Sequence, residues 1–258
     1  TSSLGQWADV STHPSSKYLG VLLMDVKGKT AIVLGGTSGI GLATTNRLTE
    51  LGAKVIAVSR DPDKAKGIVT DGVELHSCSV LDRAGLKALF EEWSKFDILV
   101  CAATGGARAA GPFLEMDLDA YQGSFAKLWG YTNAVRLAAE HLSEKGAVVL
   151  VSGAPARKTK PGGIALGSVG GAVEAFCRAV APELAPRRIN LVSPGIISTP
   201  MFGPEGSERS TKLNAATASH LIPRPGAAEE VASGIIFTIQ NDFVTGTTVD
   251  VDGGWLLS

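Results

Sequence analysis

The chain has 258 residues, of which 45% are hydrophobic and 19% are charged, so it can bury a large core and is not of disordered composition. Its formal net charge of -1 and its pI of about 6.4 give no overall positive field, which argues against nucleic acid or an anionic membrane as a partner. Length and composition together predict one compact domain.

Cysteine and histidine are sparse and follow no ligand pattern. The three cysteines are too few and too far apart for a disulfide framework or a CxxC metal site, so we expect buried thiols in a reducing compartment, the cytoplasm. The four histidines lack a spacing such as HExxH, so no metal is expected. No apolar run reaches the roughly 18 residues that span a bilayer, which predicts a soluble protein.

The chain order predicts an arm followed by alternating strands and helices. Residues 1–27 mix Ser, His, Pro and Lys with isolated apolar groups, as in an arm laid over a domain of residues 28–258. From Thr30 onward, short β-branched runs alternate with helical periods, which is typical of βαβ units. The expected strands lie near 30–35, 54–59, 73–77, 97–102, 147–152, 187–192 and 246–251. The expected helices lie near 39–51, 82–94, 117–143, 164–184 and 227–239.

The apolar character of these strands indicates the fold. They are apolar on both faces, as in sheets that helices cover on both sides. Right-handed crossovers between such strands predict a doubly wound parallel sheet, the Rossmann fold, in three α/β/α layers. The stretch 200–226 breaks the alternation and mixes apolar with polar residues, so we expect it to form a lid over the substrate.

A glycine-rich turn with the sequence Gly35-Gly36-Thr37-Ser38-Gly39-Ile40-Gly41 lies between the first strand and the first helix. Glycine lets the backbone turn tightly and approach a diphosphate, and the free N–H groups at the start of the helix favour that anion. The turn therefore predicts a dinucleotide site, with cofactor contacts from Gly35, Thr37, Ser38, Gly39 and Ile40.

The end of the second strand indicates which dinucleotide binds. It carries Ser59-Arg60 at the place where a carboxylate ordinarily binds the adenosine ribose. A hydroxyl and a planar guanidinium there suit a 2′-phosphate, so NADP(H) is predicted in preference to NAD(H). The alternative is a solvated Arg60 that pairs with Asp61 or Asp63.

Several further motifs coincide along the chain. Leu34–Gly41 looks like TGxxxGIG with leucine in the threonine place, and Asp97–Val100 leads into Cys101–Thr104, where NNAG would stand. Asn190–Thr199 is similar to NxVxPGxIxT, and Val251–Gly254 is similar to VDGG. From about residue 28 to the C-terminus, the chain thus resembles the short-chain dehydrogenase/reductase family. The resemblance implies an oxidoreductase that uses a nicotinamide cofactor, acts on a small molecule and assembles as a tetramer or dimer.

The same resemblance implies more site residues, and it places the catalytic group in doubt. Further cofactor contacts are implied at Ser79, Val80, Ala102, Ala103, Thr104, Pro194, Gly195, Ile197 and Thr199. The family usually carries YxxxK, whose tyrosine donates a proton and whose lysine lowers the pKa of that tyrosine. The aligned places here are Leu166 and Gly170, and leucine cannot transfer a proton. The serine place falls at Gly153 or, with a one-residue shift, at Ser152, and the asparagine place falls at Lys127.

Three kinds of chemistry stay open in such an atypical site. Lys127, desolvated in the pocket, could be the proton donor or oxyanion partner with help from Ser152, unless it is a surface lysine with a solvated head. A substrate that accepts hydride without a proton, such as an iminium or an activated conjugated system, would need only positioning. The fold could also serve as a non-redox nucleotide-binding pseudoenzyme. We favour an NADP(H)-dependent oxidoreductase acting on a carbonyl, imine or conjugated substrate.

Two surface features complete the predictions. The run Arg157-Lys158-Thr159-Lys160 is expected either as a solvated loop or as a pocket mouth that attracts an acidic substrate or cofactor phosphates. The helices 117–143 and 164–184 carry more small and apolar residues than one core face needs, which predicts a homo-oligomer. These residues include Ala134, Ala138, Ala139, Gly171, Ala172 and Ala175.

Overall fold

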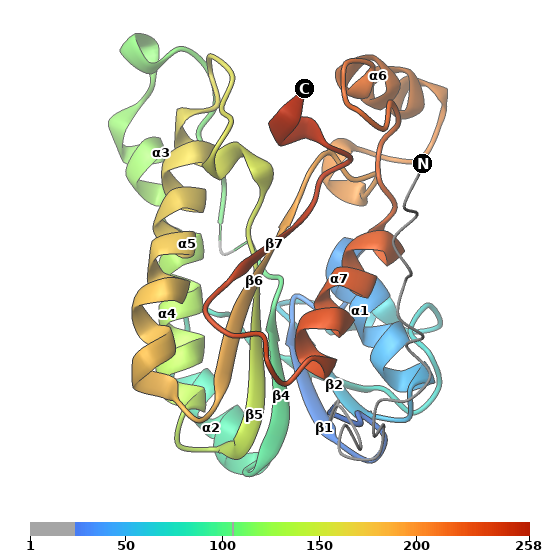
Figure 1. The fold of residues 1–258 in the computed structure, drawn as a ribbon, viewed down its shortest axis with the longest axis vertical. Coiled ribbons are helices and arrows are strands. Elements are labelled where there is room, and N and C mark those ends of the chain that lie inside the picture. Colours follow the sequence, from blue (N-terminus) through green and yellow to red (C-terminus); the bar gives the residue numbers. More distant parts are fainter. Residues whose placement is uncertain (1–23, 105) are drawn as a thin grey trace, which may run out of the picture.

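The computed structural model describes residues 24–104 and 106–258, in which seven strands form one parallel sheet (Figure 1). The strands are β1 (Thr30–Leu34), β2 (Lys54–Ser59), β3 (Glu74–Ser77), β4 (Phe96–Cys101), β5 (Leu142–Val151), β6 (Arg188–Pro194) and β7 (Thr248–Val251). Their order is β3-β2-β1-β4-β5-β6-β7, which reverses between β1 and β4. Ligands of such sheets bind outside the carboxyl ends of the strands at this reversal. The predicted doubly wound parallel sheet is confirmed.

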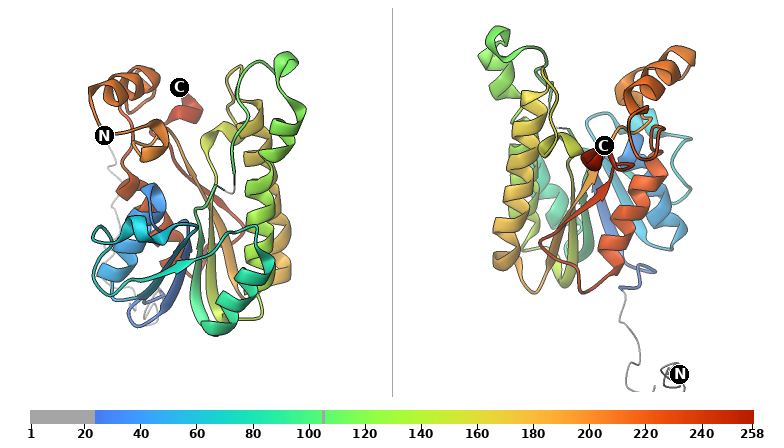
Figure 2. Two further views of the ribbon diagram at one scale, coloured as in Figure 1. Left: turned by 180° about the vertical axis from the view of Figure 1, so that it is seen from behind. Right: turned by 45° about the horizontal axis from the view of Figure 1, so that its top comes forward.

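Helices cover both faces of the sheet, as the two views in Figure 2 show. One face carries α2 (Arg83–Glu92), α4 (Ala126–Ala138) and α5 (Ile164–Leu184), and the other carries α1 (Gly39–Glu50) and α7 (Ala228–Gln240). Short 3-10 turns are η2 (Pro62–Ala65), η3 (Phe113–Glu115), η4 (Ala154–Ala156) and η6 (Trp255–Leu257). Each face of the sheet has its own hydrophobic core, and alternate residues of β1 point into the two cores. Ile32 and Leu34 pack under α2 and α4, and Val33 packs under α1. Because helices bury both faces of the sheet, the structure has the three predicted α/β/α layers.

The helix predicted over 117–143 is wrong in its continuity and its end. The structure has α3 (Leu118–Gly123) and α4 there, followed by β5 from Leu142. At the junction the backbone makes a 3-10 type hydrogen bond, in which the Phe125 amide donates to the Gln122 carbonyl three residues earlier. The Ser124 hydroxyl donates to the Ala120 carbonyl (2.9 Å) and accepts from the Ala109 amide (2.8 Å). These side-chain bonds add to the backbone bond from the Ser124 amide to the Ala120 carbonyl (3.1 Å) and tie the junction to the loop at Ala109.

Two segments lie outside the regular alternation of strands and helices, residues 200–226 and the N-terminal residues. The stretch 200–226 contains the turn η5 (Pro200–Phe202) and the helix α6 (Ser207–Thr217), and its role as a lid stays a prediction. The predicted arm of residues 1–27 lies mostly outside the described residues, which begin at Met24. The Met24 amide donates to the Gln240 carbonyl at 2.8 Å, and Val26 is buried, so the chain is joined to the α7 side from residue 24 onward.

Helix α5 corrects the expectation that no stretch has the apolar character of a membrane span. An 18-residue window of α5 has a mean hydropathy of 1.4, and by length and composition it could cross a bilayer. The sequence pattern concealed this because Glu174 and Arg178 interrupt the apolar run. In the structure, Val173 and Cys177 belong to the core under the helix, and the nearly buried Glu174 pairs with Arg157 at 3.1 Å. Helix α5 is therefore a core helix of this sheet.

Candidate functional site

One large cleft of about 640 Å³ lies at the carboxyl ends of the strands, where the strand order reverses. Its walls come from the segments that follow β1 to β6, together with α4, α5 and the predicted lid. Every predicted cofactor or catalytic residue lines it: Gly35, Thr37, Ser38, Gly39, Ile40, Ser59, Arg60, Ser79, Val80, Ala102, Ala103, Thr104, Lys127, Ser152, Pro194, Gly195, Ile197 and Thr199. The structure thus brings these residues together, and their roles stay predictions.

The glycine turn after β1 is packed too closely for side chains. A Cβ on Gly41 would lie 2.0 Å from the Gly35 carbonyl oxygen, and a Cβ on Gly35 would lie 2.6 Å from the Ala103 nitrogen. Gly39 has a φ of +51°, a conformation that favours glycine. Ser38, the N-cap residue of α1, makes no side-chain capping bond. The first amides of α1 are therefore left for an anion in the cleft, as a diphosphate site requires.

The tip of β2 presents Ser59 and Arg60 to the cleft. The alternative in which Arg60 pairs with Asp61 or Asp63 is wrong, because each carboxylate instead pairs with the lysine three residues further on, at 2.9 and 2.8 Å. Ser59 Oγ is buried and has no hydrogen-bond partner among the described residues. A guanidinium and an orphan hydroxyl at this tip fit a ribose that carries a phosphate.

The other end of the cleft forms where β4 and β6 end. The Ala102 amide donates to the Leu34 carbonyl at 2.8 Å, which holds the segment after β4 against the glycine turn. A Cβ on Gly195 would lie 2.8 Å from the Asp252 backbone, so the segment after β6 is also tightly packed. Thr199 is nearly buried and closes over the glycine turn. These contacts fix the separation between the two halves of the cleft.

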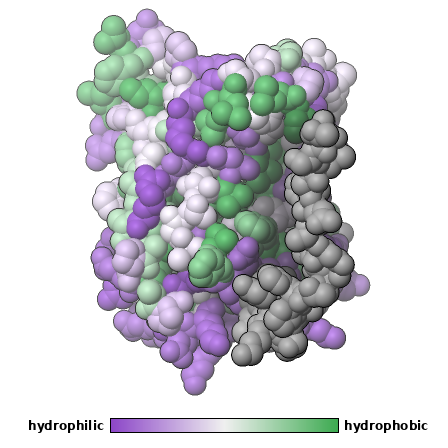
Figure 3. Space-filling model, in the orientation of Figure 1, coloured by the Kyte–Doolittle hydropathy of each residue, from purple (hydrophilic) through white to green (hydrophobic). Residues whose placement is uncertain are grey.

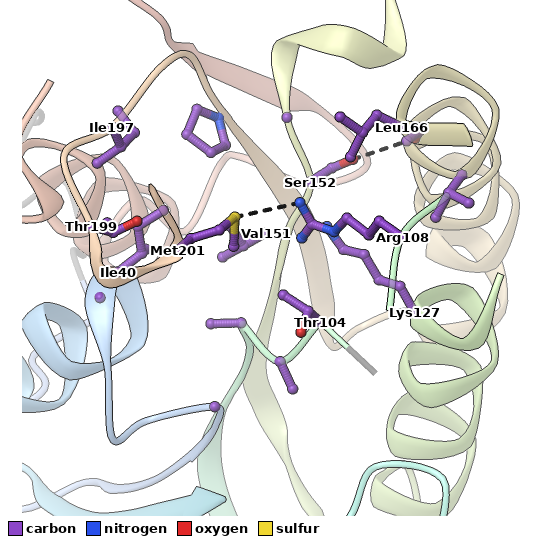
Figure 4. Close-up of a pocket in the computed structure, with 18 of the residues that line it drawn as sticks. Ile40, Thr104, Arg108, Lys127, Val151, Ser152, Leu166, Ile197, Thr199 and Met201 are labelled. Carbon is purple, nitrogen blue, oxygen red and sulfur yellow. Dashed lines mark hydrogen bonds between the residues drawn. The ribbon is translucent and has the colours of Figure 1, made fainter. Parts of the chain in front are cut away.

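Lys127 extends from α4 into the cleft (Figure 4). Its ammonium nitrogen lies 5.5 Å from the ring centre of Tyr131, one turn along the same helix. Burial, with a second contribution from the positive charge of Arg108, lowers the pKa of Lys127 from 10.5 to about 7. Lys127 is thus not the solvated surface lysine that the sequence left open, and it can exchange a proton near neutral pH.

Ser152 follows β5, and its hydroxyl donates to the Gly170 carbonyl at 3.4 Å. That hydrogen bond is long, so the hydroxyl can rotate toward a ligand at little cost. Leu166 and Gly170, the places aligned with tyrosine and lysine, also line the cleft. A Cβ on Gly170 would lie 2.9 Å from the Cβ of Ala156. This turn of α5 therefore has no room for a lysine side chain.

Arg108 is a residue of the cleft that the sequence predictions missed. It lies in the loop between β4 and η3, and Figure 4 shows its guanidinium directed into the cleft, as the end of Lys127 is. Its Nη1 donates to the Met201 sulfur at 3.5 Å, and a thioether is a weak acceptor. The signal in the sequence is a lone basic residue within a Gly- and Ala-rich run after the fourth strand.

The basic run at residues 157–160 was predicted either as a solvated loop or as part of the pocket mouth, and its residues differ in position. Arg157 does not line the cleft and instead pairs with Glu174 at 3.1 Å. Lys158 and Lys160 do line the cleft, and Lys158 Nζ donates to the Trp255 carbonyl at 2.9 Å. The run is therefore partly a structural anchor and partly a wall of the cleft.

Comparisons with known proteins agree with this geometry. A model of the family described as Enoyl-(Acyl carrier protein) reductase matches residues 35–256. The L-xylulose reductase of Bos taurus is 30% identical over 245 residues, which cover 90% of this chain and 99% of that protein. A solved small-chain dehydrogenase in complex with NADPH is 28% identical, with a TM-score of 0.74 and coverage of 90% of this chain and 100% of that one. A short chain oxidoreductase from Pseudomonas aeruginosa PAO1, described as containing an atypical catalytic center, is 25% identical, with a TM-score of 0.79 and coverage of 88% and 97%.

Proposed function

The chain belongs to the short-chain dehydrogenase/reductase family, and from this premise we propose that it is an NADP(H)-dependent oxidoreductase with a non-standard active site. Its substrate is a small carbonyl, imine or conjugated compound. The observation that carries the proposal is the position of Lys127, whose pKa is about 7, in the same cleft as the glycine turn. A group that titrates near neutrality can replace the missing tyrosine as a proton donor.

NADP(H) suits the chemistry of the cleft walls. The turn Gly35–Gly41 would hold the diphosphate, and Ser59 with Arg60 would hold the phosphate-bearing ribose. The segments Ala102–Thr104 and Pro194–Thr199 would hold the nicotinamide end. When bound, the nicotinamide supplies or accepts the hydride. The relative in complex with NADPH supports this choice of nucleotide.

Lys127 supplies the proton that a carbonyl needs. As the carbonyl carbon gains a hydride, the carbonyl oxygen gains a proton from the charged Lys127, which then recovers a proton from water. The Ser152 hydroxyl donates a hydrogen bond to the same oxygen as negative charge develops on it. A cationic iminium would be repelled by Lys127 and Arg108, so a neutral carbonyl is the preferred substrate.

One set of measurements separates this function from its competitor, non-redox nucleotide binding. NADPH and NADH are titrated by calorimetry, and loss of NADPH absorbance is followed with ketones, imines and conjugated enones. Turnover with any class supports the oxidoreductase. Tight cofactor binding with no turnover on any class would replace it with the non-redox function, and no binding of either nucleotide would remove both.

The compartment and the assembly belong to the same proposal. The three cysteines are free, and Cys101 and Cys177 are buried, which suits a reducing, cytoplasmic environment.

We also propose a homo-oligomer, but not all of the small residues predicted for its interface are exposed. Ala134 and Ala138 are buried against the sheet and do not reach a partner, whereas Ala175 of α5 is exposed.

A further inference from the structure

The charged side chains that line the cleft are all cationic. Within residues 24–104 and 106–258, no aspartate or glutamate lines it, whereas five cationic side chains do: Arg60, Arg108, Lys127, Lys158 and Lys160. Arg60 lies at the cofactor end, and Lys158 is held by the Trp255 carbonyl at 2.9 Å. Arg108 and Lys127 lie together in the part of the cleft that the cofactor segments leave to a substrate.

These two cations have no anionic partner in the described part of the chain. Every ion pair there joins other residues. Arg108 has the Met201 sulfur at 3.5 Å, and Lys127 has the Tyr131 ring at 5.5 Å. Like charges in a partly desolvated site repel each other, and a bound anion would relieve that repulsion.

We propose that the substrate is an oxo acid whose carboxylate is bound by Arg108, so that its carbonyl faces Lys127; this inference rests on the proposed function. A guanidinium offers two parallel N–H donors that match the two oxygens of a carboxylate. The Met201 sulfur is a weak acceptor, so a carboxylate takes over its donor readily. Arg108 thereby sets the substrate class, and Lys127 acts on the neighbouring carbonyl.

A carboxylate fits this position better than a phosphate ester. Bound phosphates usually take several donors from backbone amides, as at the glycine turn on the other side of the cleft. Near Arg108, the Ser124 hydroxyl already donates to the Ala120 carbonyl at 2.9 Å. The neighbouring walls include the apolar Met201 and Leu166. A planar guanidinium flanked by these apolar side chains suits a monocarboxylate with a short apolar chain, and it leaves the neighbouring Lys127 to the carbonyl of the same substrate.

A binding experiment tests the carboxylate site independently of turnover. NADPH-loaded protein is titrated by calorimetry with acetate, butyrate and benzoate, and with acetamide, butyramide and benzamide. In the wild type, at least one acid should bind about 10-fold or more tightly than its amide, as expected for a charge-assisted pair. Arg108→Met should abolish this preference, and Arg108→Lys, which keeps the charge without the planar fork, should retain part of it.

A charge-matched control guards against general effects. Arg136→Met removes an arginine of α4 whose side chain is 73% exposed, and the acid preference should persist in it. Thermal unfolding checks that Arg108→Met is folded. The proposal is overturned if no acid binds, if the acid preference survives Arg108→Met, or if inorganic phosphate binds more tightly than every carboxylate.

Turnover assays separate failure of this inference from failure of the proposed function. Oxo acids are compared with their methyl esters as substrates for NADPH oxidation. If acids bind through Arg108 but neither acids nor esters are reduced, the carboxylate site stands and the oxidoreductase fails. If esters and simple ketones are reduced while acids show no preference, the oxidoreductase stands and the carboxylate site fails.

Discussion

Lys127 combines a charged group with a site that disfavours charge. Burial and the nearby Arg108 lower its pKa to about 7, so it is half protonated near neutrality. If charged Lys127 donates the proton, kcat/KM for ketone reduction should be highest below pH 7 and fall about tenfold per pH unit above it. Rates measured from pH 5.5 to 9 test this. A flat profile, or an unchanged profile in Lys127→Met, would remove Lys127 from the proton transfer.

The same lysine should make the protein less stable than it could be. Because its pKa is about 7 in the folded chain and 10.5 when unfolded, the unfolded state binds more protons between these values. The cost of burying the charge is therefore complete below pH 7 and declines as pH rises toward 10. We expect Lys127→Met to raise the unfolding free energy by about 1–3 kcal/mol at pH 6.5 and by less at pH 9.5. Denaturant titrations at both pH values measure this, and destabilisation at pH 6.5 would contradict it.

Arg60 provides a residue-scale test of nucleotide choice. Its guanidinium lines the cleft and has no carboxylate partner among the described residues, so it is available to a 2′-phosphate. Arg60→Ala should weaken NADPH binding about 10- to 100-fold and change NADH binding little, because only NADPH carries the phosphate. Lys64→Ala, in the neighbouring turn η2, serves as the control. Equal losses for the two nucleotides would defeat the assignment.

At the scale of elements, strands and the glycine turn were predictable because local patterns determine them. A strand such as β1, buried on both faces, needs a continuous apolar run, and the turn after it needs glycine where a Cβ would strike backbone. The break at Ser124 depends on a hydrogen bond from Ala109, which no local pattern reveals. Arg108 was missed for a related reason, since the conformation of a loop decides where its side chain points.

The glycine turn allows a sharp test at this scale. A Cβ on Gly41 would lie 2.0 Å from the Gly35 carbonyl oxygen, so Gly41→Ala must displace the turn from the start of α1. We expect it to lose about 10-fold or more in affinity for both nucleotides and to destabilise the fold by about 1–3 kcal/mol. Calorimetry and thermal unfolding measure the two effects. Gly123→Ala, where nothing lies within 4 Å of the added Cβ, should leave both nearly unchanged.

At the scale of the whole molecule, the cleft is assembled from segments that are distant in the chain. The cleft draws walls from β1 through the segment after β6, while one end of the molecule exposes apolar side chains around α3 (Figure 3). Phe113, Leu114 and Leu118 there are 52%, 95% and 69% exposed. Clustered exposed apolar groups of this kind mark surfaces that other proteins cover. Together with the small residues outside α5, they favour assembly of this chain with itself.

Self-association should depend on the outer face of α5. Ala175 is exposed on that helix, so two copies that pack there would bring their Ala175 side chains into a close, apolar contact. Ala175→Arg places like charges in such a contact and should weaken association on the order of 100-fold. Light scattering at micromolar concentration measures the mass, with Ala84→Arg on the exposed side of α2 as the charge-matched control. A wild-type monomer, or an assembly that Ala175→Arg leaves intact, would show that α5 faces solvent instead.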